Sequence, residues 1–185
     1  MTRRQMMTAA VGTSFVGLAA LVGLAGYYGV PREDDDDDDD EGGGQEALTQ
    51  ALRYSKVGLQ QGLAASEEVG QPISGKFELQ NRKVQLLVYT SKEGKLSEAL
   101  VDLATGKVAN VEPLTRTDDL ANAQSQSAAM ASAKTSLKEA VDKASAEAAG
   151  FRAVGVIPNL KDGHPVASVL LLKGERSQIV NVTLD

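Results

Sequence analysis

The sequence predicts an α+β protein with two small units, each a helix followed by a three-stranded antiparallel sheet, behind an N-terminal hydrophobic helix and a disordered acidic linker. Two stretches have apolar residues at helical spacing, and each precedes three short runs in which apolar and polar residues alternate. The chain of 185 residues also begins with a long uncharged segment followed by nine consecutive carboxylates. The expected divisions are an export or anchor segment (1–31), the linker (32–44), a first unit (45–114), a partly helical connection (115–135) and a second unit (136–185).

The net charge of −6 comes from the N-terminal region. Residues 1–32 contain three arginines and no acid, residues 33–41 are all acidic, and the rest of the chain has equal numbers of basic and acidic residues. A body without net charge is poorly suited to nucleic acid, which is bound through clustered Lys and Arg, so no nucleic-acid partner is expected. The absence of Cys excludes disulfides, thiolate metal sites and cysteine nucleophiles, and a single His excludes a multi-histidine metal site. No cofactor is predicted.

The N-terminal segment has the features of a signal peptide or a membrane anchor. Arg3 and Arg4 are followed by no charged residue until Arg32. This length suffices for a membrane helix, which needs roughly 20 apolar residues, and the two arginines favour a cytoplasmic N-terminus. If the segment is not cleaved, residues 8–30 are expected to cross the membrane. In both cases the rest of the chain is predicted to lie in the cell envelope, periplasmic or otherwise extracytoplasmic, either membrane-anchored or secreted.

The acidic run has two interpretations. Neighbouring carboxylates repel one another and extend the chain, which suits a solvated spacer with a flexible joint at Gly42–Gly44. The alternative is a cation-responsive, calcium-binding segment with Asp34, Asp36, Asp38 and Asp40 as candidate ligands, because hard cations prefer oxygen. A homopolymer lacks the spaced ligands and glycine turn of a calcium loop, so the spacer is the favoured interpretation.

Both units follow the same order of elements. In the first, leucines at 48, 52, 59 and 63 share one helix face, and Gly70 and Pro72 end the helix. Strands are then expected at 76–79, 84–89 and 96–103. In the second, Ser136 and Glu139 form a capping-box pattern at the start of a helix, and strands are expected at 151–160, 166–172 and 179–185.

The last strand of the first unit continues into Asp102, Thr105, Gly106, Lys107 and Val108, which form a D-x-x-T-G-K-V pattern. Asp and Thr side chains can cap a tight turn there, and Gly permits positive φ. Residues 84–108 resemble the C-terminal half of a PepSY domain. The second unit resembles the family in element order, without the final motif, so the resemblance covers roughly residues 47–112 and 136–185. It implies an exported, non-catalytic module proposed to bind or restrain peptidases, with no catalytic residues to transfer.

Few residues suggest catalysis, and no enzyme activity is expected. His164 lies in a predicted turn, and no Gly-x-Ser-x-Gly nucleophile motif is present. Glu67–Glu68 and Asp118–Asp119 are adjacent pairs, and adjacent residues on a helix do not face each other. The predicted partner is therefore an envelope protein or peptide, held as an extended segment at a sheet edge or in a groove.

Overall fold

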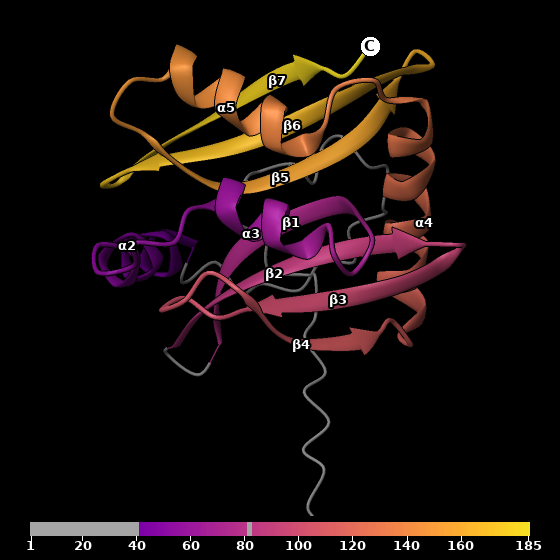
Figure 1. Cartoon of the computed structure of the whole chain (residues 1–185). Coiled ribbons are helices and arrows are strands. Elements are labelled where there is room, and N and C mark those ends of the chain that lie inside the picture. The colour runs from indigo at the N-terminus through magenta and orange to yellow at the C-terminus, as the bar shows by residue number, and fades with distance from the viewer. Residues whose placement is uncertain (1–40, 81–82) are drawn as a thin grey trace, which may run out of the picture.

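The computed structural model describes residues 41–80 and 83–185, which form a mixed α/β structure with four helices and one seven-stranded antiparallel sheet (Figure 1). The strand order is β4-β3-β2-β1-β5-β6-β7. The elements are α2 (Glu41–Leu52), α3 (Leu59–Ser66), β1 (Gln71–Gln80), β2 (Lys83–Lys92), β3 (Lys95–Val101), β4 (Val108–Pro113), α4 (Thr117–Ser132), α5 (Leu137–Glu147), β5 (Arg152–Lys161), β6 (His164–Lys173) and β7 (Arg176–Thr183).

The predicted three-stranded sheets of the two units are joined into one sheet, because β1 pairs with β5. The antiparallel ladder between them contains the pairs Gly75–Val156 and Lys76–Gly155, and β4 adds a seventh strand. A unit of this size buries too little apolar surface to be more than marginally stable alone. The junction gives both halves one contiguous core, which includes Leu59, Phe77 and Val169.

The two halves repeat with a constant offset of 81 residues. The first hairpins close at Gln80–Lys83 and Lys161–His164, and the second at Lys92–Lys95 and Lys173–Arg176. The register shifts in β1, between Pro72 and Ser74, and in β5, between Ala153 and Gly155, follow the same offset. Strand β7 is therefore the counterpart of β3, and β5 that of β1. Because equivalent strands pair antiparallel at the centre, an approximate two-fold axis relates the halves.

Helices lie on both faces of the sheet. Helix α3 covers the face to which Gly75 points, where an added Cβ would lie 3.1 Å from Leu63. Helix α5 packs beside α3 (Figure 1). In each strand, every second residue points to the opposite face of the sheet. On that face the Ser127 hydroxyl of α4 donates to the Ser91 hydroxyl of β2 at 3.2 Å. Helix α4 thus covers the opposite face.

The single helix predicted through residues 48–63 is divided into α2 and α3. The guanidinium of Arg152, at the start of β5, donates to the carbonyl oxygens of Leu52 (2.6 Å), Ser55 (3.1 Å) and Val57 (2.8 Å). These acceptors lie in and beside the connection between the two helices. Arg152 also lies over the Phe77 ring at 5.4 Å. A side chain about 100 residues away in sequence therefore stabilises a break that the leucine spacing alone did not predict.

Helix α2 differs from the expectation, whereas the connection at 115–135 is partly helical as expected. Helix α2 begins at Glu41 and includes Gly42–Gly44, which were predicted as a flexible joint. The connection expected at 115–135 contains the 16-residue helix α4. Within the described ranges no helix is long and apolar enough to cross a membrane. The predicted anchor (1–31) and the candidate ligands Asp34, Asp36, Asp38 and Asp40 lie outside the described residues.

Replacing Arg152 with Leu should lower the free energy of unfolding by about 2 kcal/mol, because three carbonyl groups lose a charged donor while the apolar stem is kept. Urea unfolding followed by circular dichroism measures this. Lys161→Ala, an exposed change in the same strand, is the control and should have little effect. Equal stability of the two variants would contradict the role given to Arg152.

Candidate functional site

The D-x-x-T-G-K-V motif forms the turn between β3 and β4. Asp102 Oδ1 accepts hydrogen bonds from the Ala104 amide (3.1 Å), the Thr105 amide (2.7 Å) and the Thr105 hydroxyl (2.8 Å). The hydrogen bond from the Thr105 side chain is the main reason that the pKa of Asp102 lies below its ordinary value. Gly106 has φ of 72°, which only Gly adopts readily. The motif is thus a self-contained turn.

This turn places β4 on the outer side of β3. The Asp102 amide donates to the Lys107 carbonyl at 2.9 Å, and β4 then pairs with Ser97–Val101. The new outer edge has features that discourage further pairing: β4 is short, its ladder contains a register shift, and it ends in Glu112 and Pro113. This edge of the sheet is therefore protected.

The opposite edge, β7, has no strand on its outer side among the described residues. The Leu184 amide donates to the Pro165 carbonyl. The backbone amide and carbonyl groups of Leu184 and of every second residue before it therefore point toward β6. The backbone groups that face outward then belong to Ser177, Ile179, Asn181 and Thr183. The first half supports this assignment. Leu96 occupies the position equivalent to Ser177, and its carbonyl faces outward to β4, where it accepts a hydrogen bond from the Leu114 amide.

Strand β7 lacks the protective features of β4. Between Ser177 and Leu184 there is no charge and no proline, and its ladder with β6 has no register shift. Ile179 is 36% exposed, and Ser177, Asn181 and Thr183 are also exposed. An edge strand with an uncharged stretch of this length can act as a template for another strand. The candidate functional site is this outer side of β7, which we call the open edge.

The open edge is held at both ends. The amides of Lys134 and Thr135 donate to the Leu184 carbonyl at 2.7 and 3.0 Å, and the Leu184 side chain is fully buried. At the other end the Arg176 guanidinium lies over the Phe151 ring at 5.3 Å, and the Thr49 hydroxyl of α2 donates to the Gly174 carbonyl in the preceding turn. A partner strand would therefore meet an ordered backbone.

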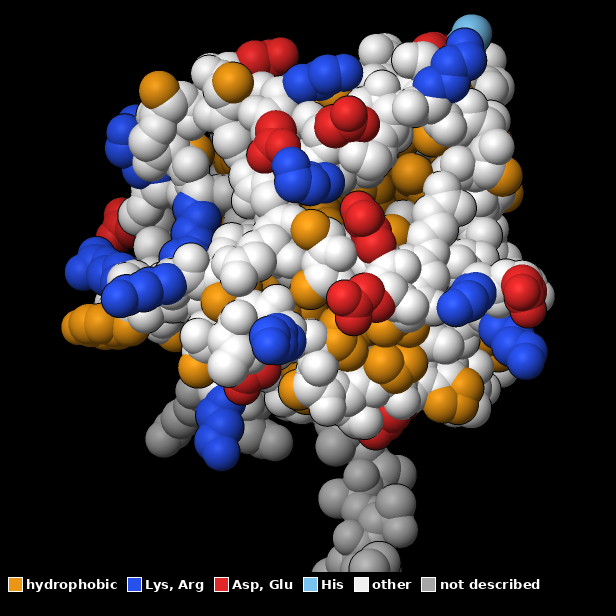
Figure 2. Space-filling model, in the orientation of Figure 1, with side chains coloured by type: hydrophobic (Ala, Val, Ile, Leu, Met, Phe, Trp, Pro, Cys, Tyr) orange, Lys and Arg blue, Asp and Glu red, His pale blue; other side chains and the backbone are white. Residues whose placement is uncertain are grey.

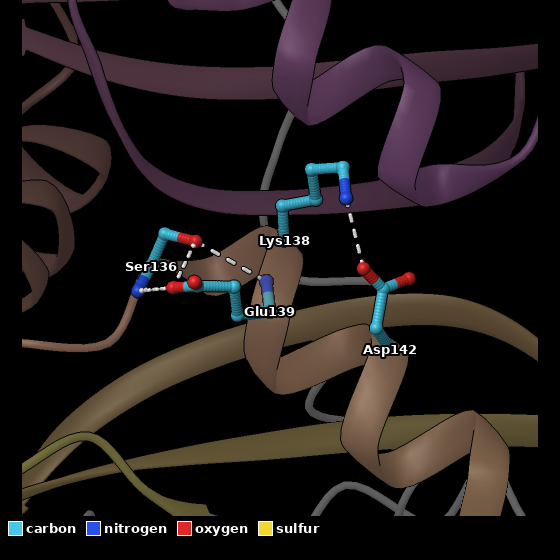
Figure 3. Close-up of polar contacts among 4 residues, drawn as sticks. All are labelled: Ser136, Lys138, Glu139 and Asp142. Carbon is cyan, nitrogen blue, oxygen red and sulfur yellow. Dashed lines mark hydrogen bonds and ion pairs between the residues drawn. The ribbon is translucent and has the colours of Figure 1, made fainter.

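The start of α5 borders a cleft of about 290 Å³. The Ser136–Glu139 capping box is confirmed, and Lys138 pairs with Asp142 at 2.8 Å (Figure 3). The backbone hydrogen bond from Ser136 is the main cause that lowers the pKa of Glu139, and the hydrogen bond to Asp142 raises that of Lys138. These polar groups satisfy one another, so they assemble no reactive constellation. Gln71, which lines the cleft, stands at the position equivalent to Arg152.

The other residues singled out in the sequence are not brought together. His164 is exposed and its Nδ1 lies 3.3 Å from an Asp185 oxygen. Glu67 borders the cleft. Asp119 is buried near Arg116 (3.7 Å), whereas Asp118 is exposed. Among the described residues no group of three His, Cys, Asp or Glu side chains could hold a metal ion.

Sequence reasoning missed a buried polar cluster behind the sheet. Lys76 is 1% exposed and pairs with Glu78, although the alternation in β1 assigns both to a solvated face. Tyr89 is fully buried, and burial is the main cause that raises its pKa. An alternating pattern assigns the polar residues on this face to solvent. They are buried because α4 covers the face, and the pattern in β1 does not show where α4 lies. On the face of α3 and α5, charges of both signs are interspersed without a single-sign patch (Figure 2).

The comparisons with known proteins add no assignment. No protein-family model matches the chain, and neither curated proteins nor solved structures give a match. The functional interpretation therefore rests on the sequence pattern and the geometry of the open edge.

The turn motif predicts a pH effect. Because the folded state holds the pKa of Asp102 below its ordinary value of 3.8, its carboxylate stabilises the fold above that pH and ceases to do so as the pH falls through the lowered pKa. Asp102→Asn should therefore flatten the loss of unfolding free energy between about pH 5 and about pH 2. Urea unfolding across this range tests it. Asp162→Asn, in the exposed β5–β6 turn, controls for the loss of one carboxylate; identical pH profiles for both variants would refute the assignment.

Proposed function

We propose that this chain is a non-catalytic cell-envelope module with two PepSY-like units that binds an extended segment of a protein or peptide partner and thereby modulates a peptidase. The observation that carries the proposal is the difference between the two edges of the sheet. Strand β3 is covered by β4, whereas its counterpart β7 presents an unprotected edge. In β-strand addition, backbone hydrogen bonds provide affinity and alternate side chains provide specificity.

The envelope location is supported by the basic start and the long uncharged segment. The PepSY-like assignment is supported by the repeated order of helix and antiparallel strands at an offset of 81 residues. It is supported in the first half by the Asp102–Val108 turn as well.

Ile179→Pro tests the use of the open edge. Its amide faces outward, so proline removes a hydrogen-bond donor for an added strand without removing one to β6. A photoactivatable residue at Ser177 in the full chain, irradiated in intact envelopes, should crosslink an envelope protein. We expect about ten-fold less of this product with Ile179→Pro, because the ring also blocks close approach. The crosslinked protein is identified by mass spectrometry and assayed for peptidase regulation.

Two controls define failure. Ile179→Ala keeps the outward amide and should retain most of the product, and the same photoactivatable residue at Ala109 on β4 should yield little of it. Circular dichroism confirms that both Ile179 variants fold. A product that persists with Ile179→Pro, or that forms equally from Ala109, would rule out the open edge as the binding site.

A further inference from the structure

We infer that the cleft at the start of α5 binds a short peptide that has both ends free and an apolar side chain. The cleft has a volume of about 290 Å³ and lies between the end of α3, the start of β1 and the α4–α5 connection. None of its lining residues belongs to β7. The inference therefore concerns a second site and requires neither the open edge nor a peptidase.

The repeat shows which part of the other half corresponds to this cleft. Helices α3 and α5 end at the same offset that relates the strands. At this offset Gln71 corresponds to Arg152, whose guanidinium binds three carbonyl groups in and beside the α2–α3 connection. The residues equivalent to these three acceptors are Ala133, Ser136 and Lys138, and all of them line the cleft together with Gln71. The cleft is thus the counterpart of the place that the Arg152 side chain fills.

The chain does not fill this second place from within. Gln71 is shorter than the equivalent Arg152 and is exposed. Gly70 stands where the other half has Phe151. A Cβ at Gly70 would lie 2.8 Å from the Ser91 carbonyl oxygen, so the backbone there leaves no room for a side chain. The repeat therefore leaves open in one half a place that it closes in the other.

The differences between the halves argue against a second guanidinium as the occupant. Helix α5 begins almost one turn earlier in the repeat than α3. As a result the Ser136 carbonyl accepts from the Ala140 amide at 3.0 Å and belongs to the helix. Two lysines, Lys134 and Lys138, also line the cleft. A purely cationic group would lose an acceptor and meet like charges.

The cleft instead combines an apolar lining with one charge of each sign. Its apolar part is formed by Leu63, Met130 and Leu137, which are almost fully buried. Glu67 follows the end of α3 and Lys134 lies in the α4–α5 connection, and both are exposed. Neither forms an ion pair with another described residue. The charge of Lys138, by contrast, is matched by Asp142 at 2.8 Å (Figure 3).

This lining defines the chemistry of the ligand. Small-ligand sites have a mostly apolar lining with a few polar groups that fix orientation. The complementary molecule carries an ammonium group for Glu67, a carboxylate for Lys134 and an apolar body between them. Since small-ligand sites span roughly 300–1,000 Å³, the cleft suits the smallest such ligands, of about two residues. A free amino acid shares this chemistry, so the test includes one.

The methyl group of Met130 reports on the cleft. The other three methionines, at positions 1, 6 and 7, lie outside the described residues. The full-length chain, labelled with carbon-13 in its methionine methyl groups, is titrated with leucyl-leucine and with leucine. The Met130 signal, assigned with Met130→Leu, should shift saturably and at lower concentration with the dipeptide. No saturable shift up to about 10 mM, or tighter binding of leucine, would overturn the inference.

Blocked peptides test the two charges separately. Acetylation removes the ammonium group of the dipeptide and amidation removes its carboxylate, and each should raise the Kd about five-fold, as expected for partly exposed ion pairs. Glu67→Gln should weaken the unblocked dipeptide to the same extent but leave the acetylated one unaffected. Lys134→Gln should do the same for the amidated dipeptide. Losses that simply add between variant and blocked peptide would show that these charges do not meet the ligand.

Gln71→Arg closes the cleft with the side chain that the other half uses. This variant should abolish the shift of Met130, whereas Gln124→Arg, an exposed change in α4 that adds the same charge, should keep it. Circular dichroism confirms that both fold. Unchanged binding by Gln71→Arg would overturn the inference.

These outcomes are distinct from those of the proposed function. If leucyl-leucine binds as expected but Ser177 gives no crosslink to an envelope protein, the cleft is a ligand site and the open-edge proposal fails. If Ser177 gives the crosslink but the Met130 signal does not shift, the open edge binds its partner and the cleft inference is wrong.

Discussion

The architecture depends on the short ladder between β1 and β5. Only Gly75–Val156 and Lys76–Gly155 connect the two halves through the sheet, yet this contact lets them share one core. Gly75 has no side chain, so Leu59 and Leu63 of α3 approach the strand closely. Arg152, at the start of β5, reaches the carbonyl groups between α2 and α3 and links the second half to the first. Without this junction each half would be a small sheet with one more unpaired edge strand, β1 or β5, and little buried apolar surface.

Local patterns in the sequence predicted most strands and the start of α5, because turns and caps depend on neighbouring residues. Glu93–Gly94 and Asp162–Gly163 adopt positive φ between strands that were predicted, and Ser136 caps α5 as expected. The single sheet and the break between α2 and α3 were not predictable in this way, since each depends on contacts between residues far apart in the chain. The order of elements predicted two repeated units, but their constant offset was not predictable, since only a few equivalent positions, such as Val88 and Val169, carry the same residue.

The two halves end differently, and this difference creates the candidate site. At Asp102 the side chain caps a turn that returns the chain along β3. The equivalent position is Thr183, and the next residue, Leu184, is buried and bound through its carbonyl by the α4–α5 connection. The second half therefore directs its last strand toward the helices instead of into a returning strand. The resemblance pointed to the motif residues themselves, but their role is to protect one edge, so the site lies where the motif is missing.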